Sequence, residues 1–337
     1  MGTSARRRIL FICGSLNQTT MMHEIGKHLG HHDCFYTPFY SDGVLRWLTQ
    51  NGLLDFTVLG GEFRRLTDHY IDQHRLPLDE RGESRDYDLV VTGSDLVVQR
   101  NIRGKPVVLV QEGMTDPEDL GFRLVRALNL PRWLASTATM GLSLAYDKFC
   151  VASAGYRDHF VAKGVPADRL VVTGIPNFDD CNAFRDNDFP HRGYVLVATS
   201  DTRETFKLDN RQGFLDRVRR IANGRPLIFK LHPNEKVARS TREIMAAFPD
   251  ALVFARGNTN HMIANCDVLI TQYSTVVYVG LALGKECHSY FDRAQLERLA
   301  PIQNGGTSAR NVAAVCEQLF AEEGTRRVER AVVRRAS

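Results

Sequence analysis

The sequence PLIFKLHPNE, which spans Pro226–Glu235, predicts a buried strand that ends at a polar turn. Leu227–Leu231 is a short apolar run of about one strand's length, and a helical segment follows from Lys236. Ligands of open α/β sheets bind just beyond the carboxyl ends of strands, where His232 would lie. Pro233 would fix the turn and keep the imidazole out of the following helix. The alternative is a histidine that only ends a strand.

Length and composition bound the class of protein. The chain has 337 residues, enough for two domains, and its net charge of +4 does not by itself imply nucleic-acid binding. Its seven cysteines are scattered and form no C-x-x-C pair, a pattern of a reducing compartment rather than of disulfides or zinc. No apolar run reaches the length of a membrane span, and the N-terminal residues lack the apolar core of a signal peptide. We therefore expect a cytoplasmic protein without a nucleic-acid partner.

Strands and helices alternate along the chain, which predicts an α/β fold with two doubly wound, Rossmann-like domains that face each other across a cleft. The polar segment after Leu170–Asp179 separates two such series, so we expect domains at 1–175 and 176–323, with a basic tail at 324–337. The predicted strands are, in the first series, 8–13, 34–39, 53–59, 89–92, 107–110, 149–152 and 170–173, and in the second 194–198, 227–230, 251–254, 268–271 and 287–290.

A second motif lies in Asp267–Lys285, with the sequence DVLITQYSTVVYVGLALGK. A strand should end at Thr271, and a helix should start after the turn, with Ser274 or Thr275 as its N-cap. Hydroxyls and unpaired N–H groups at a helix start form an anion site. Together with His232 on a neighbouring strand, this turn could hold a phosphate. The alternative is an ordinary N-cap.

The third motif is Gln111-Glu112-Gly113, directly after the apolar run that ends at Val110. A carboxylate at this strand end would face the expected cleft and could take a proton from an attacking hydroxyl. Gly113 allows an unusual backbone turn. The alternative is a glutamate that caps a helix begun by Asp116 and Pro117.

Other phosphate and metal chemistry fits the sequence poorly. No phosphate-binding loop of the G-x-x-x-x-G-K-[ST] type occurs, and Cys13-Gly14-Ser15 is not a dinucleotide fingerprint. The acidic residues near Asp179 and Asp186 have no histidine partner, and the histidines have no metal-ligand spacing. We expect neither a metal nor a cofactor.

The three motifs together resemble those of two-domain GT-B glycosyltransferases that use cytidine-activated donors. Bacterial sialyl- and polysialyltransferases carry an acidic pair followed by Gly, an HP motif, and a Ser-Ser or Ser-Thr motif. Capsule Kdo transferases and CDP-glycerol glycerophosphotransferases are similar in the second half, where KLHP and ITQYST stand in this chain. LVVTGIPNFD resembles the domain-joining strand of GT-B enzymes, including UDP-GlcNAc 2-epimerases. Three residues depart from the family patterns. Gln111 stands where an acidic residue is common, Gln272 stands where the glycerophosphotransferases of teichoic acid synthesis have Asp before the Tyr, and Glu286 stands where Pro often follows Gly-Lys.

The resemblance implies a metal-independent transferase that moves a sialic acid-like or Kdo-like sugar, or a polyol phosphate, from a CMP or CDP donor to a glycan or lipid-linked glycan. Glu112 would be the general base and His232 would contact the donor phosphate. The implied donor-side residues are His232, Pro233, Ser274, Thr275, Thr199, Ser200 and Asn258, and the acceptor-side residues are Gly14, Ser15, His23 and Gly113. If Glu112 is not the base, Asp116 or His23 is the next candidate.

Two other functions and a membrane contact stay open at this point. The chain could be an isomerase of the UDP-GlcNAc 2-epimerase type, or a non-catalytic nucleotide-sugar-binding protein. In the tail, Val328, Ala331 and Val332 alternate with arginines, which predicts a peripheral membrane contact on anionic lipid. A frayed terminus is the alternative.

Overall fold

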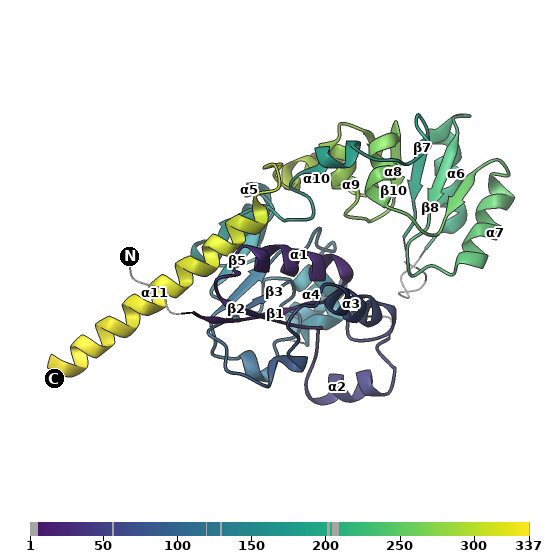
Figure 1. Ribbon diagram of the computed structural model, residues 1–337. Helices are drawn as coiled ribbons and strands as arrows, with labels where there is room; N and C mark the ends of the chain where they lie inside the picture. The colour runs from purple at the N-terminus through teal and green to yellow at the C-terminus, as the bar shows by residue number, and fades with distance from the viewer. Residues whose placement is uncertain are drawn as a thin grey trace. The chain divides into compact units, whose positions relative to one another are not determined.

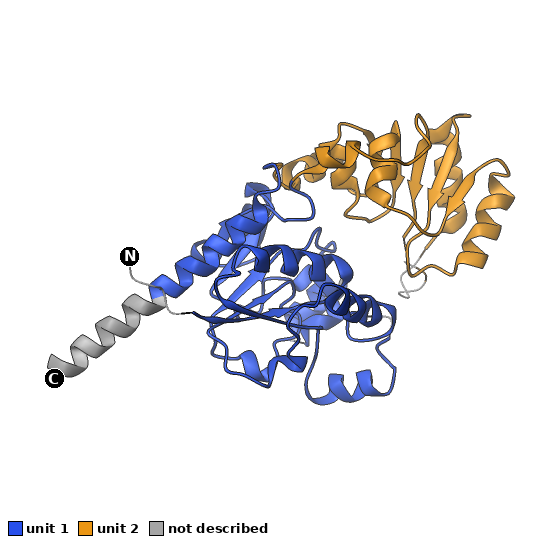
Figure 2. Cartoon of the chain, viewed as in Figure 1, with its two compact units in different colours: residues 1–179, 304–337 blue, residues 180–303 orange. Residues whose placement is uncertain are grey.

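The computed structural model describes residues 6–55, 57–118, 120–128, 130–200, 203 and 209–336, with the side chains of 120 and 323–336 left aside. The chain forms two compact units (Figures 1 and 2). Unit 1 comprises Met1–Asp179 and Asn304–Ser337, and unit 2 comprises Asp180–Gln303. The expected tail at 324–337 lies outside the residues whose side chains are described, so its membrane contact stays a prediction.

Unit 1 contains a six-stranded parallel sheet in the order β2-β1-β3-β4-β5-β6. Its strands are almost entirely apolar and buried, as expected for a parallel sheet covered on both faces. Leu10 on β1 pairs with Phe35 on one side and Val90 on the other. The strands are β1 (Arg8–Ile12), β2 (Asp33–Thr37), β3 (Leu89–Thr92), β4 (Val107–Val110), β5 (Lys148–Val151) and β6 (Leu170–Val172).

The helices of unit 1 connect these strands (Figure 1). The α-helices are α1 (Leu16–Lys27), α2 (Gly43–Gln50), α3 (Gly61–Gln73), α4 (Leu120–Ala127), α5 (Ala154–Ala162) and α11 (Ser308–Ala336). The 3₁₀ segments are η1 (Glu80–Gly82), η2 (Arg100–Ile102), η3 (Arg132–Thr139) and η4 (Ala167–Arg169). The predicted strand at 53–59 is wrong for the described residues of that range, because the segment forms successive turns between α2 and α3. Thr57 N–H donates to the Leu54 carbonyl, and Gly60 N–H donates to that of Thr57.

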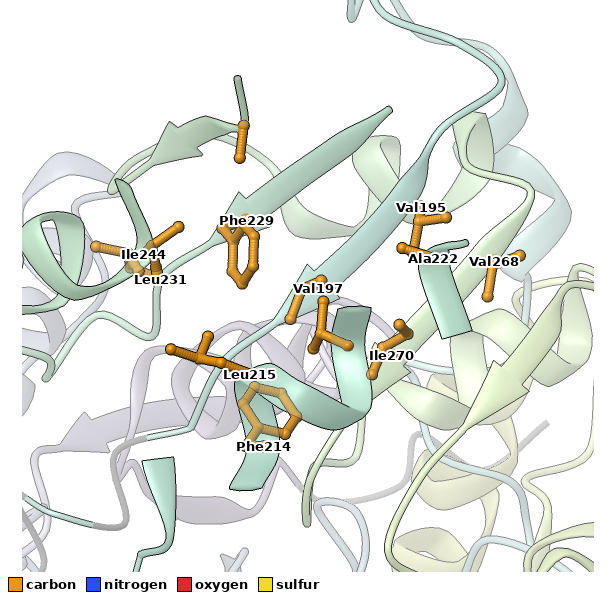
Figure 3. Packing of buried hydrophobic residues seen from close by; sticks show 12 residues of the cluster. Val195, Val197, Phe214, Leu215, Ala222, Phe229, Leu231, Ile244, Val268 and Ile270 are labelled. Carbon is orange, nitrogen blue, oxygen red and sulfur yellow. The ribbon is translucent and has the colours of Figure 1, made fainter. Parts of the chain in front are cut away.

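Unit 2 contains a five-stranded parallel sheet in the order β11-β10-β7-β8-β9. One hydrophobic cluster of its core packs α6 and α7 against this sheet, where Phe214 and Leu215 gather with Val197 and Ile270 (Figure 3). The strands are β7 (Val195–Ala198), β8 (Leu227–Lys230), β9 (Leu252–Phe254), β10 (Val268–Thr271) and β11 (Glu286–His288). The helices are η5 (Cys181–Arg185), α6 (Arg211–Ala222), α7 (Val237–Ala247), α8 (Thr259–Asn265), α9 (Val277–Ala282) and α10 (Arg293–Leu299).

The point where each unit ends differs from the sequence expectation of 1–175 and 176–323. The structure assigns Asn304 and the residues after it to unit 1, because α11 packs against α1 and β4 and buried Asp179 binds the start of this segment. Its carbonyl accepts hydrogen bonds from the N–H groups of Asn304 and Gly305, at 2.9 and 3.0 Å. Its carboxylate accepts one from Ser308 N–H at 2.8 Å, which fixes the start of α11.

The strand order fixes where each unit can bind a ligand. The order reverses between β1 and β3 in unit 1 and between β7 and β10 in unit 2. Loops that leave the carboxyl ends of strands on either side of such a reversal diverge and leave a crevice between them. Gly14–Ser15 follows β1, whereas Thr199–Ser200 and Gln272–Thr275 follow β7 and β10. Six of the residues predicted to form the site therefore lie at these two reversals.

Candidate functional site

In unit 1, Glu112 is the centre of a hydrogen-bonded cluster. Its carboxylate, just past β4, accepts one hydrogen bond from Ser15 Oγ and another from Gln18 Nε2, each at 2.6 Å. Two residues predicted for the site, Ser15 and Glu112, are thus brought together although 97 positions separate them. The carboxylate is held by Gln18 on α1 and by Ser15, the N-cap of α1. A general base has to be held in a fixed orientation by such contacts.

The neighbouring Gln111 explains the departure from an acidic pair. Gln111 is fully buried, and its amide bridges two backbone groups. Its Oε1 accepts from Ala152 N–H at 3.0 Å, and its Nε2 donates to the Gly113 carbonyl at 2.7 Å. A carboxylate in this position could not donate the second bond. Gln111 therefore fixes the loop that presents Glu112.

The environment of Glu112 favours proton uptake. Burial raises the pKa of the Glu112 carboxyl, and the hydrogen bonds from Ser15 and Gln18 oppose that rise. The Glu112 side chain is half-buried, so part of it stays accessible to solvent. A general base works best when its pKa lies near the operating pH, and a carboxyl reaches that range only when its pKa is raised.

Sequence reasoning missed Gln18. Ser15 is the N-cap of α1, where its hydroxyl accepts from Gln18 N–H at 3.2 Å. Ser15-Leu16-Asn17-Gln18 fits the S-x-x-Q capping-box pattern, a signal that marks Gln18 as a residue near the start of a helix. Its amide is turned to Glu112, and it occupies the space beside Gly14. A Cβ on Gly14 would lie 1.6 Å from Gln18 Oε1.

His23 and Asp116, the two reserve candidates for the base, have other partners. His23 Nδ1 lies 3.1 Å from the hydroxyl of Tyr70, and the His23 ring packs edge-on against Tyr36. Burial lowers the pKa of His23, and the nearby charge of Lys27 lowers it further. The Asp116 carboxylate accepts a hydrogen bond from Thr137 Oγ1 at 2.9 Å.

In unit 2, His232 is held in a turn by its backbone. Its N–H is shared between Thr199 Oγ1 at 3.2 Å and Glu235 Oε2 at 3.0 Å. Across Pro233, the N–H of Asn234 donates to His232 Nδ1 at 3.3 Å. An Nδ1 that accepts a hydrogen bond leaves the proton of the neutral ring on Nε2, where it can be donated to an anion. The structure thus brings His232 and Thr199 together.

The residue that organises this turn is Glu235, which sequence reasoning also missed. Its carboxylate is buried and accepts from His232 N–H, from Thr199 Oγ1 and, at 3.0 Å, from Ser240 Oγ. Arg211 Nη1 lies 3.7 Å away. A buried carboxylate is tolerated only with such partners. The sequence signal that could have identified Glu235 is its position, three residues after the histidine of the HP motif.

The turn after β10 differs from the predicted helix start. α9 begins at Val277 with Val276 as its N-cap, so the prediction that Ser274 or Thr275 is the N-cap is wrong. Their carbonyls instead accept from the N–H groups of Val277 and Tyr278, at 3.3 and 3.0 Å. The two residues form a tight turn that delays the helix.

Ser200 is joined to this same turn through Gln272. Ser200 Oγ donates to Gln272 Oε1 at 2.6 Å, and Gln272 Nε2 donates to Asp209 Oδ1 at 3.0 Å. An aspartate at position 272 would place two carboxylates together, which explains the departure from the teichoic acid pattern. Asn258, in contrast, caps α8: its Oδ1 accepts from the N–H groups of Asn260 and His261.

Among the described residues, one group has the make-up of a metal site. His31 Nε2 and His32 Nε2 lie 2.8 and 3.0 Å from Glu317 Oε1. However, Arg7 N–H donates to His32 Nδ1 at 3.3 Å, which leaves the proton on Nε2. The pattern favours hydrogen bonds that join α11 to the start of β2 over metal ligation. Within the described part of the chain, no helix has the length and apolarity needed to cross a bilayer.

No family model matches the chain, and no curated protein matches it in sequence. Several solved structures share its fold. A UDP-N-acetylglucosamine 2-epimerase has a TM-score of 0.57 and 12% identity, with 96% of this chain and 97% of that chain covered. The Methanocaldococcus jannaschii UDP-GlcNAc 2-epimerase, solved with UDP-GlcNAc and UDP, has a TM-score of 0.55 and 13% identity, with 91% of each chain covered. The wall teichoic acid polymerase TagF, soaked with CDPG, has a TM-score of 0.53 and 10% identity, with 94% and 89% covered.

These likenesses show the fold alone, because sequence identity is so low. With two parallel α/β sheets in doubly wound order, the chain has the GT-B fold that the sequence predicted. The same fold carries both epimerases and a polymerase, so the activity has to be argued from the residues of the site.

Proposed function

We propose that this protein is a metal-independent glycosyltransferase of the GT-B type. It would move a sialic acid-like or Kdo-like sugar, or a polyol phosphate, from a CMP- or CDP-activated donor to a glycan hydroxyl in cell-surface polysaccharide synthesis. The observation that carries the proposal is the Glu112 carboxylate, held by Ser15 and Gln18 at the carboxyl edge of a sheet with its pKa raised by burial. A transferase needs one such base for its acceptor.

Unit 2 supplies the proposed donor site. His232 and the turns after β7 and β10 stand at that unit's strand-order reversal or beside it. The tautomer of His232 imposed by Asn234 N–H gives a donor for a phosphate oxygen. Thr199 and Glu235 hold the turn from within, so little reorganisation is needed when charge develops on the leaving nucleotide.

The proposed step is a single displacement. The acceptor oxygen forms a bond to the anomeric carbon of the donor sugar as the bond from that carbon to the phosphate oxygen breaks. The acceptor proton passes to Glu112, and the bonding electron pair leaves with the nucleotide, whose charge His232 stabilises. With a polyol phosphate donor, the acceptor attacks phosphorus instead and CMP leaves.

The second candidate function is UDP-GlcNAc 2-epimerisation, which the fold of the compared epimerases favours. An epimerase needs further acids in the site. Asp95, which follows β3 at the same edge, is buried and accepts from the N–H groups of Gly141 and Ser143 and from Arg132. Glu235 is equally engaged. These contacts support a single-base transfer over an epimerase. A non-catalytic nucleotide-sugar-binding protein would have no use for a carboxyl whose pKa is raised.

The test has two parts. A thermal-shift panel of CMP, CDP, UDP, UMP and GDP identifies the nucleobase that the protein prefers, because a ligand that binds only the folded state raises the melting temperature. We expect CMP or CDP to give the largest shift. Incubation of the protein with UDP-GlcNAc in the absence of an acceptor then separates the two activities: conversion to a 2-epimer would replace the transferase proposal with the epimerase.

A further inference from the structure

Five large apolar side chains are exposed along a short stretch of unit 1. Leu124 and Leu128 are 57% and 64% exposed, and Leu130, Trp133 and Leu134 are 39%, 42% and 53% exposed. We call these five residues the leucine–tryptophan patch. They belong to α4, to η3 and to the short connection between the two, and α4 and η3 pack against each other. Several large apolar side chains exposed on neighbouring packed segments are typical of an interaction site.

The exposure of the patch does not come from a poorly packed helix. α4 already buries Phe122 and Val125 on its inner side. Leu124 and Leu128 are one helical turn apart on the outer side, joined by the hydrogen bond from Leu128 N–H to the Leu124 carbonyl at 3.0 Å. A helix with apolar residues on both sides needs a second apolar partner for its outer side.

The base of the patch is fixed from inside the unit. The ammonium of Lys163 is buried beneath it, donates to the Ala138 carbonyl and lies 5.2 Å from the centre of the Phe122 ring. Thr139 Oγ1 donates to the Arg132 carbonyl at 3.0 Å, which closes η3 on itself. These contacts hold the backbone beneath the patch in a defined conformation.

Two arginines are exposed beside the outward leucines. Residues 120–145 contain Arg123, Arg126 and Arg132 and no acidic residue, but Arg132 is paired with buried Asp95. The exposed Glu118, just before α4, lies 3.6 Å from the ammonium of Lys163. Arg123 and Arg126 are exposed on α4, beside the outward leucines. Arginines beside exposed leucines and a tryptophan are typical of surfaces that lie in the interface of an anionic bilayer. Tryptophan also prefers the headgroup level of a membrane.

We propose that the leucine–tryptophan patch docks unit 1 on a bilayer with anionic headgroups. The patch is close in the chain to the proposed base, because residues 113–119 join Glu112 to α4. It is also joined to that loop by the hydrogen bond between Thr137 and Asp116. The proposal deepens the proposed function in one respect, since it implies that the acceptor is presented at a membrane surface. It assigns the membrane contact to unit 1 rather than to the basic tail.

The test is vesicle flotation of the full-length protein without any nucleotide. Vesicles of phosphatidylglycerol and phosphatidylcholine should carry the wild type upward, and vesicles of phosphatidylcholine alone should carry much less. Leu124→Gln with Leu128→Gln should reduce binding at least tenfold. Arg123→Glu with Arg126→Glu should reduce binding only to the anionic vesicles, by roughly fivefold per arginine.

Two matched variants control the experiment. Val237→Gln with Met245→Gln changes an exposed apolar pair on α7 of unit 2, where the residues are 47% and 37% exposed, and should float like the wild type. Arg330→Glu with Arg334→Glu alters the tail and should also float. Normal flotation of the leucine variant, lost flotation of the tail variant, or a wild type that stays with the soluble fraction overturns the proposal. A nucleotide thermal shift on the same samples shows that the variants fold and tests the proposed function separately.

Discussion

At the residue scale, the two carboxylates Glu112 and Glu235 occupy opposite situations. Both follow a strand of a parallel sheet, and both accept hydrogen bonds from side chains. Glu112 is half-buried with two neutral donors, and burial raises its pKa. Glu235 is buried among more donors with an arginine nearby. The first arrangement suits proton uptake, whereas in the second the carboxylate holds a turn through its hydrogen bonds.

The raised pKa of Glu112 has a consequence for stability. A carboxyl whose pKa is higher in the folded state than in the unfolded chain contributes stability below the unfolded pKa, and that contribution is lost as pH rises through the folded pKa. Glu112→Gln has no ionisable group at this position, so its stability does not fall in this way. We therefore expect the melting temperature of the variant, relative to wild type, to increase as pH rises from the unfolded-state pKa to the folded-state pKa of Glu112. Thermal unfolding of both proteins from pH 4 to 9 measures it; a pH-independent difference would show that the carboxyl is not perturbed.

Replacement of Glu235 should damage both fold and site. Glu235→Ala would leave half-buried Arg211 with Glu243 as its remaining counter-charge, and would remove the acceptor used by Thr199, Ser240 and His232. A buried donor left without its acceptor typically costs about 1–3 kcal/mol. Urea unfolding should show this loss, and the CMP or CDP shift should fall. Glu235→Gln, which keeps an acceptor oxygen, and Glu243→Gln should be milder. Equal stability of Glu235→Ala and wild type would contradict the assignment.

At the element scale, the strands were predictable and the turns were not. Continuous apolar runs such as Val107–Val110 and Val268–Thr271 form strands at the positions expected, because burial on both faces leaves little choice of residue. The prediction at 53–59 failed because apolar residues there support turns between two helices. Ser274 and Thr275 have the right chemistry for an N-cap, but the chain first makes a tight turn. Local patterns mark Gln18 and Glu235 as polar residues of a helix start and a turn, but they do not specify the distant partners Glu112 and Thr199.

Helix α9 carries a prediction about close packing. A Cβ on Gly280 would lie 2.6 Å from Cys287 Sγ and 2.8 Å from Leu269 Cδ2. Gly280→Ala gains up to about 1 kcal/mol of helix propensity, but overpacking typically costs about 1–3 kcal/mol. We expect a net loss of about 1 kcal/mol or more in urea unfolding. Cys287→Ala in the same chain should restore part of it. If Gly280→Ala is as stable as wild type, α9 does not pack against the sheet as closely as described.

At the scale of the whole molecule, the two-unit layout was predictable and its boundary was not. The alternation of strands and helices predicts two doubly wound sheets, and each reversal of strand order then defines a ligand-binding edge. The return of the chain to unit 1 at Asn304 depends on the hydrogen bonds of Asp179, which no local signal reveals. We propose a division of roles in which unit 2 binds the nucleotide donor and unit 1 supplies the general base.

That division predicts two different kinetic outcomes for two substitutions. His232→Ala removes a phosphate contact in unit 2, and such charge-assisted contacts contribute about 1.5–3 kcal/mol, so the CMP or CDP shift and the transfer rate should both fall. Glu112→Gln removes the base in unit 1, so transfer should fall by about 10²–10⁴-fold while nucleotide binding survives. Thermal shift and product formation on both variants decide. Loss of nucleotide binding in Glu112→Gln would mean that Glu112 acts on the donor, and normal turnover would place the base elsewhere.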